Sequence, residues 1–184
     1  MPIVAAIPAL CARGSRALDL GTGGGRHAVF LAQQGYEVDA IDASADAVMR
    51  LRAWAIARRL AIRAELRDVG CPDIAFSRYR IVVCTFVLHF LPRDRALDLL
   101  ERARAQAAPG TVHAIAVITT QGEFYEASLS RGQFYYPEPG ELAAQYRAWG
   151  WRIHHESAAR RDSYEKRADG SAMRNVVSFT LAGV

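Results

Sequence analysis

The chain has 184 residues, a length that suits one globular domain with its own hydrophobic core. Apolar residues make up 51% of it and charged residues 23%, which excludes a disordered or fibrous chain. The formal charge of +4 comes almost entirely from arginines scattered along the sequence, and this distribution argues against a nucleic-acid partner. We therefore expect residues 1–184 to form a single domain.

The cysteines and the apolar runs bear on the cellular location of the protein. The three cysteines are odd in number and widely spaced, so they suggest neither a disulfide framework nor a metal site, and they predict a reducing cytoplasm. The longest apolar run, residues 81–91, is too short to span a bilayer. No basic segment precedes the apolar residues 3–12, so we expect no signal peptide and no membrane partner.

The first two thirds of the chain alternate between strand and helix patterns. After a short lead-in at 1–15, the predicted strands are 16–20, 36–41, 61–66, 80–85 and 112–118, and the predicted helices are 26–34, 44–60 and 93–107. Ser44 is the expected N-cap of the second helix. Strand 80–85 is the most apolar, as is typical of the centre of a parallel sheet.

The last third has a different character. It contains an aromatic and proline-containing loop at 121–139, a short helix at 140–149, and strands 151–156 and 175–181 on either side of a turn at Asp169-Gly170. The whole pattern predicts an α/β fold: a Rossmann-like, doubly wound sheet of seven mostly parallel strands with an antiparallel C-terminal edge hairpin.

A glycine-rich turn follows the first strand. Gly21, Gly23 and Gly25 stand at alternate positions between Leu20 and Arg26, where they let a ligand approach the main chain closely. Asp19, two residues before the first glycine, would repel an anionic pyrophosphate. A cationic ligand such as S-adenosylmethionine therefore fits better than NAD, although a dinucleotide fingerprint can be forced through this turn.

Two further acids stand at predicted strand ends. Asp42, 17 residues beyond Gly25, can accept both ribose hydroxyls of an adenosine. Asp68, at the end of the third strand, is placed to receive the adenine amino group, with Val69 packing nearby. The alternative is that each acid only caps a helix or a turn. Together they mark the carboxyl edge of the sheet, where open α/β folds bind ligands.

These motifs resemble those of class I S-adenosylmethionine-dependent methyltransferases. More narrowly, residues 18–26, 35–40, 84–91 and 139–142 resemble the TehB-type tellurite-resistance methyltransferases. The resemblance implies that Thr85 contacts the cofactor and that the segment after the fifth strand forms part of an acceptor pocket. The expected cofactor site then comprises Asp19, Gly21, Thr22, Gly23, Gly25, Arg26, Asp42, Ala43, Asp68, Val69 and Thr85.

Aromatic residues of the 121–139 loop are candidates for the acceptor pocket. Phe124 and Tyr125 and the run Phe134, Tyr135 and Tyr136 do not have helical spacing, so we expect some of them, the run above all, to roof a small dry cavity. An ordinary packed loop is the alternative. His89 follows the fourth strand and either faces this pocket or packs under the next helix.

The chain departs from the TehB pattern in two places. The family is thought to hold its anionic acceptor with a His-Arg pair and a further arginine, but no such pair is in register between Glu156 and Gly170. The nearest basic candidates are Lys166, Arg167 and Arg174, which could equally be solvated turn residues. About 15 residues precede the first strand, fewer than is usual in the family, which predicts a more open site or a chain without its natural start.

The expected activity is methyl transfer from S-adenosylmethionine to a small soft nucleophile, leaving S-adenosylhomocysteine. The acceptor would be a tellurite- or selenite-type oxyanion, a thiol or a small metabolite. An already ionised soft acceptor needs no general base, so alignment and water exclusion would be the main tasks of the protein. The alternatives are a protein that binds S-adenosylmethionine without transferase activity and an NAD-linked oxidoreductase.

Overall fold

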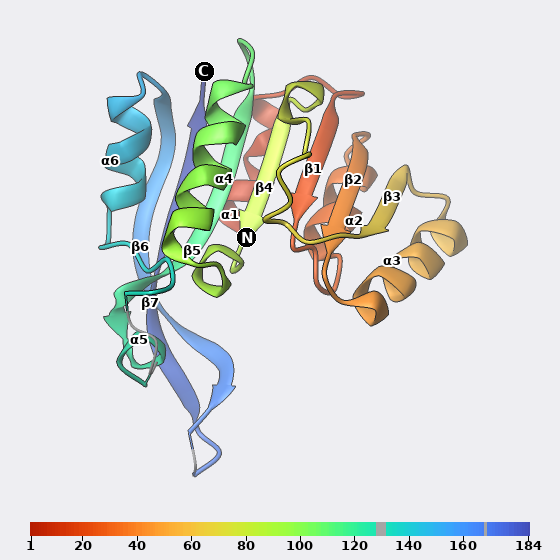
Figure 1. Ribbon diagram of the computed structural model, residues 1–184. Coiled ribbons are helices and arrows are strands. Elements are labelled where there is room, and N and C mark those ends of the chain that lie inside the picture. The colour runs from red at the N-terminus through yellow and green to blue at the C-terminus, as the bar shows by residue number, and fades with distance from the viewer. Residues whose placement is uncertain (128–131, 168) are drawn as a thin grey trace.

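A single sheet of seven strands organises the protein (Figure 1). The computed structural model describes residues 1–127, 132–167 and 169–184, with the backbone but not the side chains of residues 163–165. The strands are β1 (Arg16–Leu20), β2 (Glu37–Asp42), β3 (Ile62–Leu66), β4 (Ile81–Thr85), β5 (Val112–Gly122), β6 (Arg152–Lys166) and β7 (Ala172–Gly183). Their order is β3-β2-β1-β4-β5-β7-β6, and only β7 runs antiparallel to its neighbours β5 and β6. The predicted fold is confirmed.

Helices cover both faces of this sheet (Figure 1). They are α1 (Pro2–Ala5), α2 (Arg26–Gln33), α3 (Ala45–Arg58), α4 (Arg93–Ala105), α5 (Glu123–Ala127) and α6 (Glu141–Ala148), with 3-10 turns η1 (Ile7–Ala9), η2 (Phe76–Arg78) and η3 (Leu88–Phe90). One core joins α1, α2 and α3 to one face of the sheet, and a second core joins α4 and α6 to the other. Ser44 caps α3 as predicted, because its Oγ accepts from the backbone N–H of Ala47. Within the described residues, no helix is long and apolar enough to cross a bilayer.

The order of the strands places a crevice beside β1. This strand pairs in parallel with β2 on one side and β4 on the other, so the chain crosses the sheet in opposite directions from this point. The loops that leave the carboxyl ends of β1 and β4 therefore diverge, and ligands of open α/β sheets bind in the gap between such loops.

The segment after β5 differs from the sequence prediction. The predicted loop at 121–139 begins with the last two residues of β5 and the one-turn helix α5, and its residues 128–131 lie outside the described part of the chain. A five-residue helix leaves no periodic pattern to detect, and it is held in part by contacts with β7, which is distant in sequence.

The final hairpin is longer than predicted. Strands β6 and β7 continue to pair as far as Lys166 and Ala172, well past the Gly122–Asn175 pair where β5 ends. Backbone pairing between β6 and β7 maintains this extension, which projects away from the rest of the sheet in Figure 1. The turn forms at the predicted Asp169-Gly170, where the Arg167 N–H donates to the carbonyl of Ser171.

Candidate functional site

The glycine turn after β1 has the backbone that its sequence predicted. Gly21, Gly23 and Gly25 have φ values of +64°, +52° and +74°, which side-chain-bearing residues rarely adopt. A Cβ on Gly21 would collide with Val87, and one on Gly25 would lie 2.6 Å from Leu51 Cδ1, so these two glycines are required by packing. A Cβ on Gly23 would meet nothing within 4 Å. The same holds for Gly24, so the turn faces open space at Gly23 and Gly24.

Asp42, at the end of β2, holds this turn in place. Its Oδ2 accepts from the Gly23 N–H at 2.7 Å, and its Oδ1 accepts from the Ser44 N–H at 2.8 Å. Each carboxylate oxygen has a second lone pair, so Asp42 can accept two further hydrogen bonds. The same carboxylate can thus fix the turn and bind a pair of hydroxyl groups.

Asp19 lies buried beneath the turn, with a relative exposure of 2%. Its Oδ2 accepts from Thr22 Oγ1 at 2.7 Å. Burial raises the pKa of this carboxyl to about 6, only partly countered by the Thr22 hydroxyl and the Arg26 guanidinium. A cationic ligand above the turn would favour the ionised form, which is the electrostatic preference that the sequence suggested.

A cavity of about 410 Å³ opens over the glycine turn. Among the predicted residues, it is lined by Gly21, Thr22, Gly23, Arg26, Thr85 and His89. The walls that sequence reasoning missed comprise Gly24, His27, Phe86, Phe90, Ile118, Arg161, Asp162, Asn175 and Val177. Phe86 has a left-handed φ of +59°, a strained conformation of the kind that concentrates at functional sites. We call this space the donor cavity.

Other predicted cofactor residues lie around this region rather than in the wall of the donor cavity. The ends of β2 and β3 are adjacent, because the Arg67 N–H donates to the carbonyl of Asp42 at 2.9 Å. Asp68 is exposed, and its Oδ1 accepts from the Gly70 N–H at 2.7 Å. Val69 is buried, whereas Ala43 is exposed beside Asp42. Their contact with a cofactor remains a prediction.

A second cavity, of about 580 Å³, adjoins the first. Its walls are Phe90, Phe124, Phe134, Tyr136, Ala127, Met173, Lys166 and His89. It thus brings together four of the predicted acceptor residues, namely His89, Phe134, Tyr136 and Lys166. His89 and Phe90 line both cavities, so they form the wall where the two spaces meet. We call this second space the aromatic cavity.

Tyr135 lies on the other side of the chain from its two neighbours. Its N–H donates to the carbonyl of Leu91, and in this extended segment successive side chains point to opposite faces. Tyr135 is fully buried in the core beneath α4 and α6, whereas Tyr136 packs in the core of the opposite face. The prediction that Tyr135 lines the acceptor pocket is therefore wrong.

His89 is almost completely buried, with an exposure of 4%. Its ring lies 4.2 Å from that of Phe90 and 5.8 Å, edge-on, from that of Phe124. Burial lowers the pKa of His89 to about 4, so the imidazole is neutral near pH 7. Its Nδ1 is buried and has no hydrogen-bond partner among the described residues. Buried polar atoms without a partner are rare in folded proteins, so this one marks His89 as an unusual residue of the wall.

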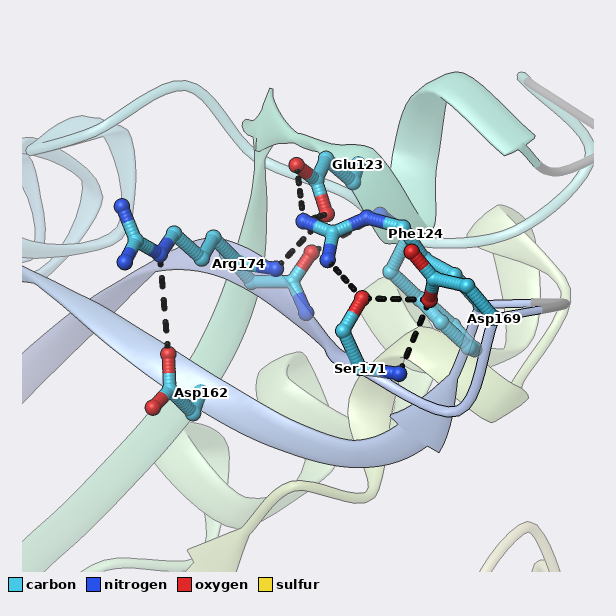
Figure 2. A network of polar contacts seen from close by, with 8 residues as sticks. Glu123, Phe124, Asp162, Asp169, Ser171 and Arg174 are labelled. Atoms are coloured by element: carbon cyan, nitrogen blue, oxygen red, sulfur yellow. Dashed lines mark hydrogen bonds and ion pairs between the residues drawn. The ribbon is translucent and has the colours of Figure 1, made fainter.

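Two of the three predicted basic residues, Arg167 and Arg174, take part in a polar network around the hairpin turn (Figure 2). The Arg167 guanidinium donates to both carboxylate oxygens of Glu123, at 2.5 and 2.6 Å, and to Ser171 Oγ. The backbone N–H of Arg174 also donates to Glu123, while its guanidinium lies 3.9 Å from Asp162. Arg167 and Arg174 are absent from the described walls of both cavities. The network therefore fastens the hairpin turn to α5.

Asn175 is a residue of the site that sequence reasoning did not single out. Its Oδ1 accepts from the Phe124 N–H at 2.8 Å, which fixes the orientation of the amide. Its Nδ2 is buried, without a partner among the residues that the structure describes. Asn175 is the first residue of the predicted strand 175–181, which in the structure begins earlier, at Ala172. The alternation of residues at the start of β7 would have been the signal to notice.

The comparisons with known proteins agree with this architecture. The sequence model of the family described as tellurite resistance protein TehB matches residues 4–174. A probable S-adenosyl-L-methionine-dependent methyltransferase TehB from Haemophilus influenzae is 28% identical over 95 residues, which cover 52% of this chain and 33% of that protein. Hemagglutinin 1 from Eikenella corrodens is 33% identical over 95 residues, which cover 52% of this chain and 31% of that protein. The matched region thus spans about a third of these relatives.

Solved structures show the same fold. The crystal structure of TehB from Haemophilus influenzae has a TM-score of 0.84 at 20% identity and covers 100% of this chain and 62% of that chain. A 1,6-didemethyltoxoflavin-N1-methyltransferase from Burkholderia thailandensis, solved with 1,6-didemethyltoxoflavin and S-adenosylhomocysteine, has a TM-score of 0.69 at 21% identity, over 97% of this chain and 76% of that chain. With the family match extending from the lead-in to β7, the chain belongs to the TehB family.

Proposed function

We propose that this protein transfers a methyl group from S-adenosylmethionine to a small soft nucleophile, of the class of tellurite- or selenite-type oxyanions, thiols and small metabolites. One observation carries the proposal most directly: Gly23 presents bare backbone to the donor cavity while its N–H is held by Asp42. The description of a TehB relative as a probable S-adenosyl-L-methionine-dependent methyltransferase supports it.

The residues around the turn suit this cofactor. The main chain at Gly21 and Gly23 would lie against its amino-acid portion, with Asp19 below to balance the positive charge. Asp42 retains the lone pairs that two ribose hydroxyls need. The other residues proposed to contact the cofactor are Thr22, Gly25, Arg26, Ala43, Asp68, Val69 and Thr85.

The bound cofactor supplies an electrophilic methyl group on a sulfonium. The protein itself then has to hold the acceptor in line with that methyl group and keep water away. The described walls of the aromatic cavity are mainly rings and a thioether, so an acceptor bound against them would itself displace water from the apolar surface. His89, neutral near pH 7, would leave an ionised acceptor unprotonated. Correct alignment alone can lower the barrier by several kcal/mol.

Calorimetric titration with S-adenosylhomocysteine tests the cofactor assignment. We expect binding by the parent protein, much weaker binding by Asp42→Ala, and unchanged binding by Asp46→Ala, whose residue is exposed in the first turn of α3. Mass spectrometry with methyl-labelled donor and a panel of tellurite, selenite and thiols then tests the reaction. Absence of both heat and a thermal shift would contradict the proposal, and binding of NADH instead would favour an oxidoreductase. Binding without turnover on any acceptor would indicate a cofactor-binding protein without transferase activity.

A further inference from the structure

The aromatic cavity narrows the class of acceptor. We propose that the acceptor is an aromatic thiol, with its ring in the aromatic cavity and its sulfur at the His89 wall that the two cavities share. This inference rests on the proposed methyltransferase function and specifies the acceptor side of the same site.

The composition of the aromatic cavity carries the first step. Phe90, Phe124, Phe134 and Tyr136 surround it, with the Met173 side chain as a further wall. Aromatic rings favour edge-on and offset contacts with another ring, and a thioether adds favourable contacts with ring edges. The Phe124 and Tyr136 rings stand 6.4 Å apart and tilted by 51°, so this wall already packs ring against ring in the geometry that aromatic groups favour. Walls of this composition bind an apolar ring more favourably than they bind a small polar ion.

The size of the cavity carries the second step. About 580 Å³ is within the range of pockets that bind organic molecules of drug size. An oxyanion of a few atoms would occupy only a small part of this space and would leave apolar walls in contact with water. A substituted benzene ring would fill more of the space and displace that water.

Phe90 is the exposed member of this aromatic wall. It lies in η3, lines both cavities, and is 58% exposed, an unusual state for a phenylalanine next to a buried histidine. A ring placed beside it would cover apolar surface that water now contacts. Phe90 is therefore expected to contribute to acceptor affinity without being needed for the fold.

His89 determines where the sulfur would lie. It is buried on the wall common to both cavities, and its Nδ1 has no partner among the described residues. This nitrogen has almost no accessible surface, so donation from it to a thiolate sulfur would require the imidazole to turn toward the shared wall. Lys166, exposed at the wall of the aromatic cavity, places a positive charge there that would attract an anionic acceptor.

The reaction then balances without a further co-reactant. The aromatic thiol loses its proton to solvent before binding, because the ring delocalises the charge of its thiolate. The thiolate sulfur forms a new bond to the methyl carbon, the bond from that carbon to the sulfonium breaks, and its electron pair stays on the donor sulfur. The products are a neutral aryl methyl thioether and S-adenosylhomocysteine.

Two acceptors of different shape test the inference. The thiolate of 4-nitrothiophenol absorbs visible light and loses this absorption on S-methylation, whereas 2-mercaptoethanol is a small aliphatic thiol. Burial of one ring should make kcat/KM for 4-nitrothiophenol about 10-fold to 100-fold higher than that for the aliphatic thiolate. Selenite and tellurite serve as the oxyanion acceptors, for which we expect lower kcat/KM values.

A matched pair of variants locates the effect. Phe90→Ala should raise KM for 4-nitrothiophenol about 10-fold, and by a clearly larger factor than it raises KM for 2-mercaptoethanol. Trp54→Ala is the control, since Trp54 is a similarly exposed aromatic residue, at 48%, on α3. Calorimetry with 4-nitrothioanisole in the presence of S-adenosylhomocysteine measures the same site without turnover, and Phe90→Ala should weaken that binding too.

The outcomes separate the two proposals. If S-adenosylhomocysteine does not bind, the proposed function fails. If it binds and an oxyanion or 2-mercaptoethanol is methylated as efficiently as 4-nitrothiophenol, the function stands and the aromatic-thiol inference is overturned. Equal effects of Phe90→Ala and Trp54→Ala, or no binding of 4-nitrothioanisole, would overturn it as well.

Discussion

Replacing Gly23 with alanine should separate the fold of the glycine turn from its contact with a ligand. The added Cβ meets nothing within 4 Å, so the substitution causes no collision within the protein. The φ of +52° remains unfavourable for alanine, at a cost of roughly 1–2 kcal/mol, and a less flexible unfolded chain offsets about 0.4–1 kcal/mol of it. The expected loss in the free energy of unfolding is thus about 1 kcal/mol, or about 2–4 °C in Tm for a chain of this size.

The effect on ligand binding should be larger and specific. The new methyl group would occupy the face along which the cofactor is proposed to approach, and loss of close contact there should weaken S-adenosylhomocysteine binding by at least about 10-fold. Gly14→Ala is a matched control, because Gly14 also has a positive φ, +82°, and a Cβ added there would likewise meet nothing within 4 Å. It lies before the amino end of β1, at the opposite edge of the sheet.

Thermal unfolding and calorimetric titration of both variants decide the matter. We expect similar losses of Tm in the two variants, and a loss of affinity in Gly23→Ala alone. Normal binding of S-adenosylhomocysteine by Gly23→Ala would refute the argument that the turn is a ligand-contacting surface. Gly23→Val, with a bulkier side chain, should abolish binding.

Other predictions concern stability. Burial lowers the pKa of three histidines to about 3–4, whereas it raises that of Asp19 to about 6; the histidines are His27, His89 and His113. On acidification from pH 6.5 to about 4, the unfolded chain binds protons at these histidines before the folded chain does. Urea titrations should therefore show a falling free energy of unfolding, by up to about 1.4 kcal/mol per pH unit for each proton by which the unfolded chain exceeds the folded one. A rise in the free energy of unfolding would contradict these pKa shifts. Glu123→Gln should speed amide exchange at the hairpin turn, because it weakens the ion pair with Arg167. Glu101→Gln, which removes an exposed ion pair with Arg104 on α4, should leave that exchange unchanged. Asn175→Leu should lower the free energy of unfolding by about 1–3 kcal/mol in urea titrations, because it leaves the Phe124 N–H unpaired; an unchanged value would show that this hydrogen bond contributes little.

The parts of the fold that the sequence predicted well are those that local patterns encode. Strand β1 has the predicted bounds, Arg16–Leu20, and Ser44 is the observed cap of α3. Apolar runs, glycines and a capping side chain all act within a few residues, so they are legible without knowledge of the partner elements.

The acceptor side was harder to predict because its geometry depends on distant pairing. The full length of β6 follows from its pairing with β7, and the direction of Tyr135 follows from a hydrogen bond to Leu91. The ion pair between Arg167 and Glu123 joins residues 44 positions apart. No local property of the sequence distinguishes an arginine that pairs in this way from one that is free to bind an anion.

The two cavities draw their walls unequally from the chain. The glycine turn and the end of β4 supply much of the donor cavity, whereas the aromatic cavity takes its described walls from residue 89 onward, from η3, the region of α5 and the final hairpin. Substitutions in this later part can therefore reshape the aromatic cavity while the turn held by Asp42 keeps its form. Under the proposed function, acceptor choice can therefore change independently of the glycine turn, and Phe124, Phe134 and Tyr136 are the positions at which to engineer it.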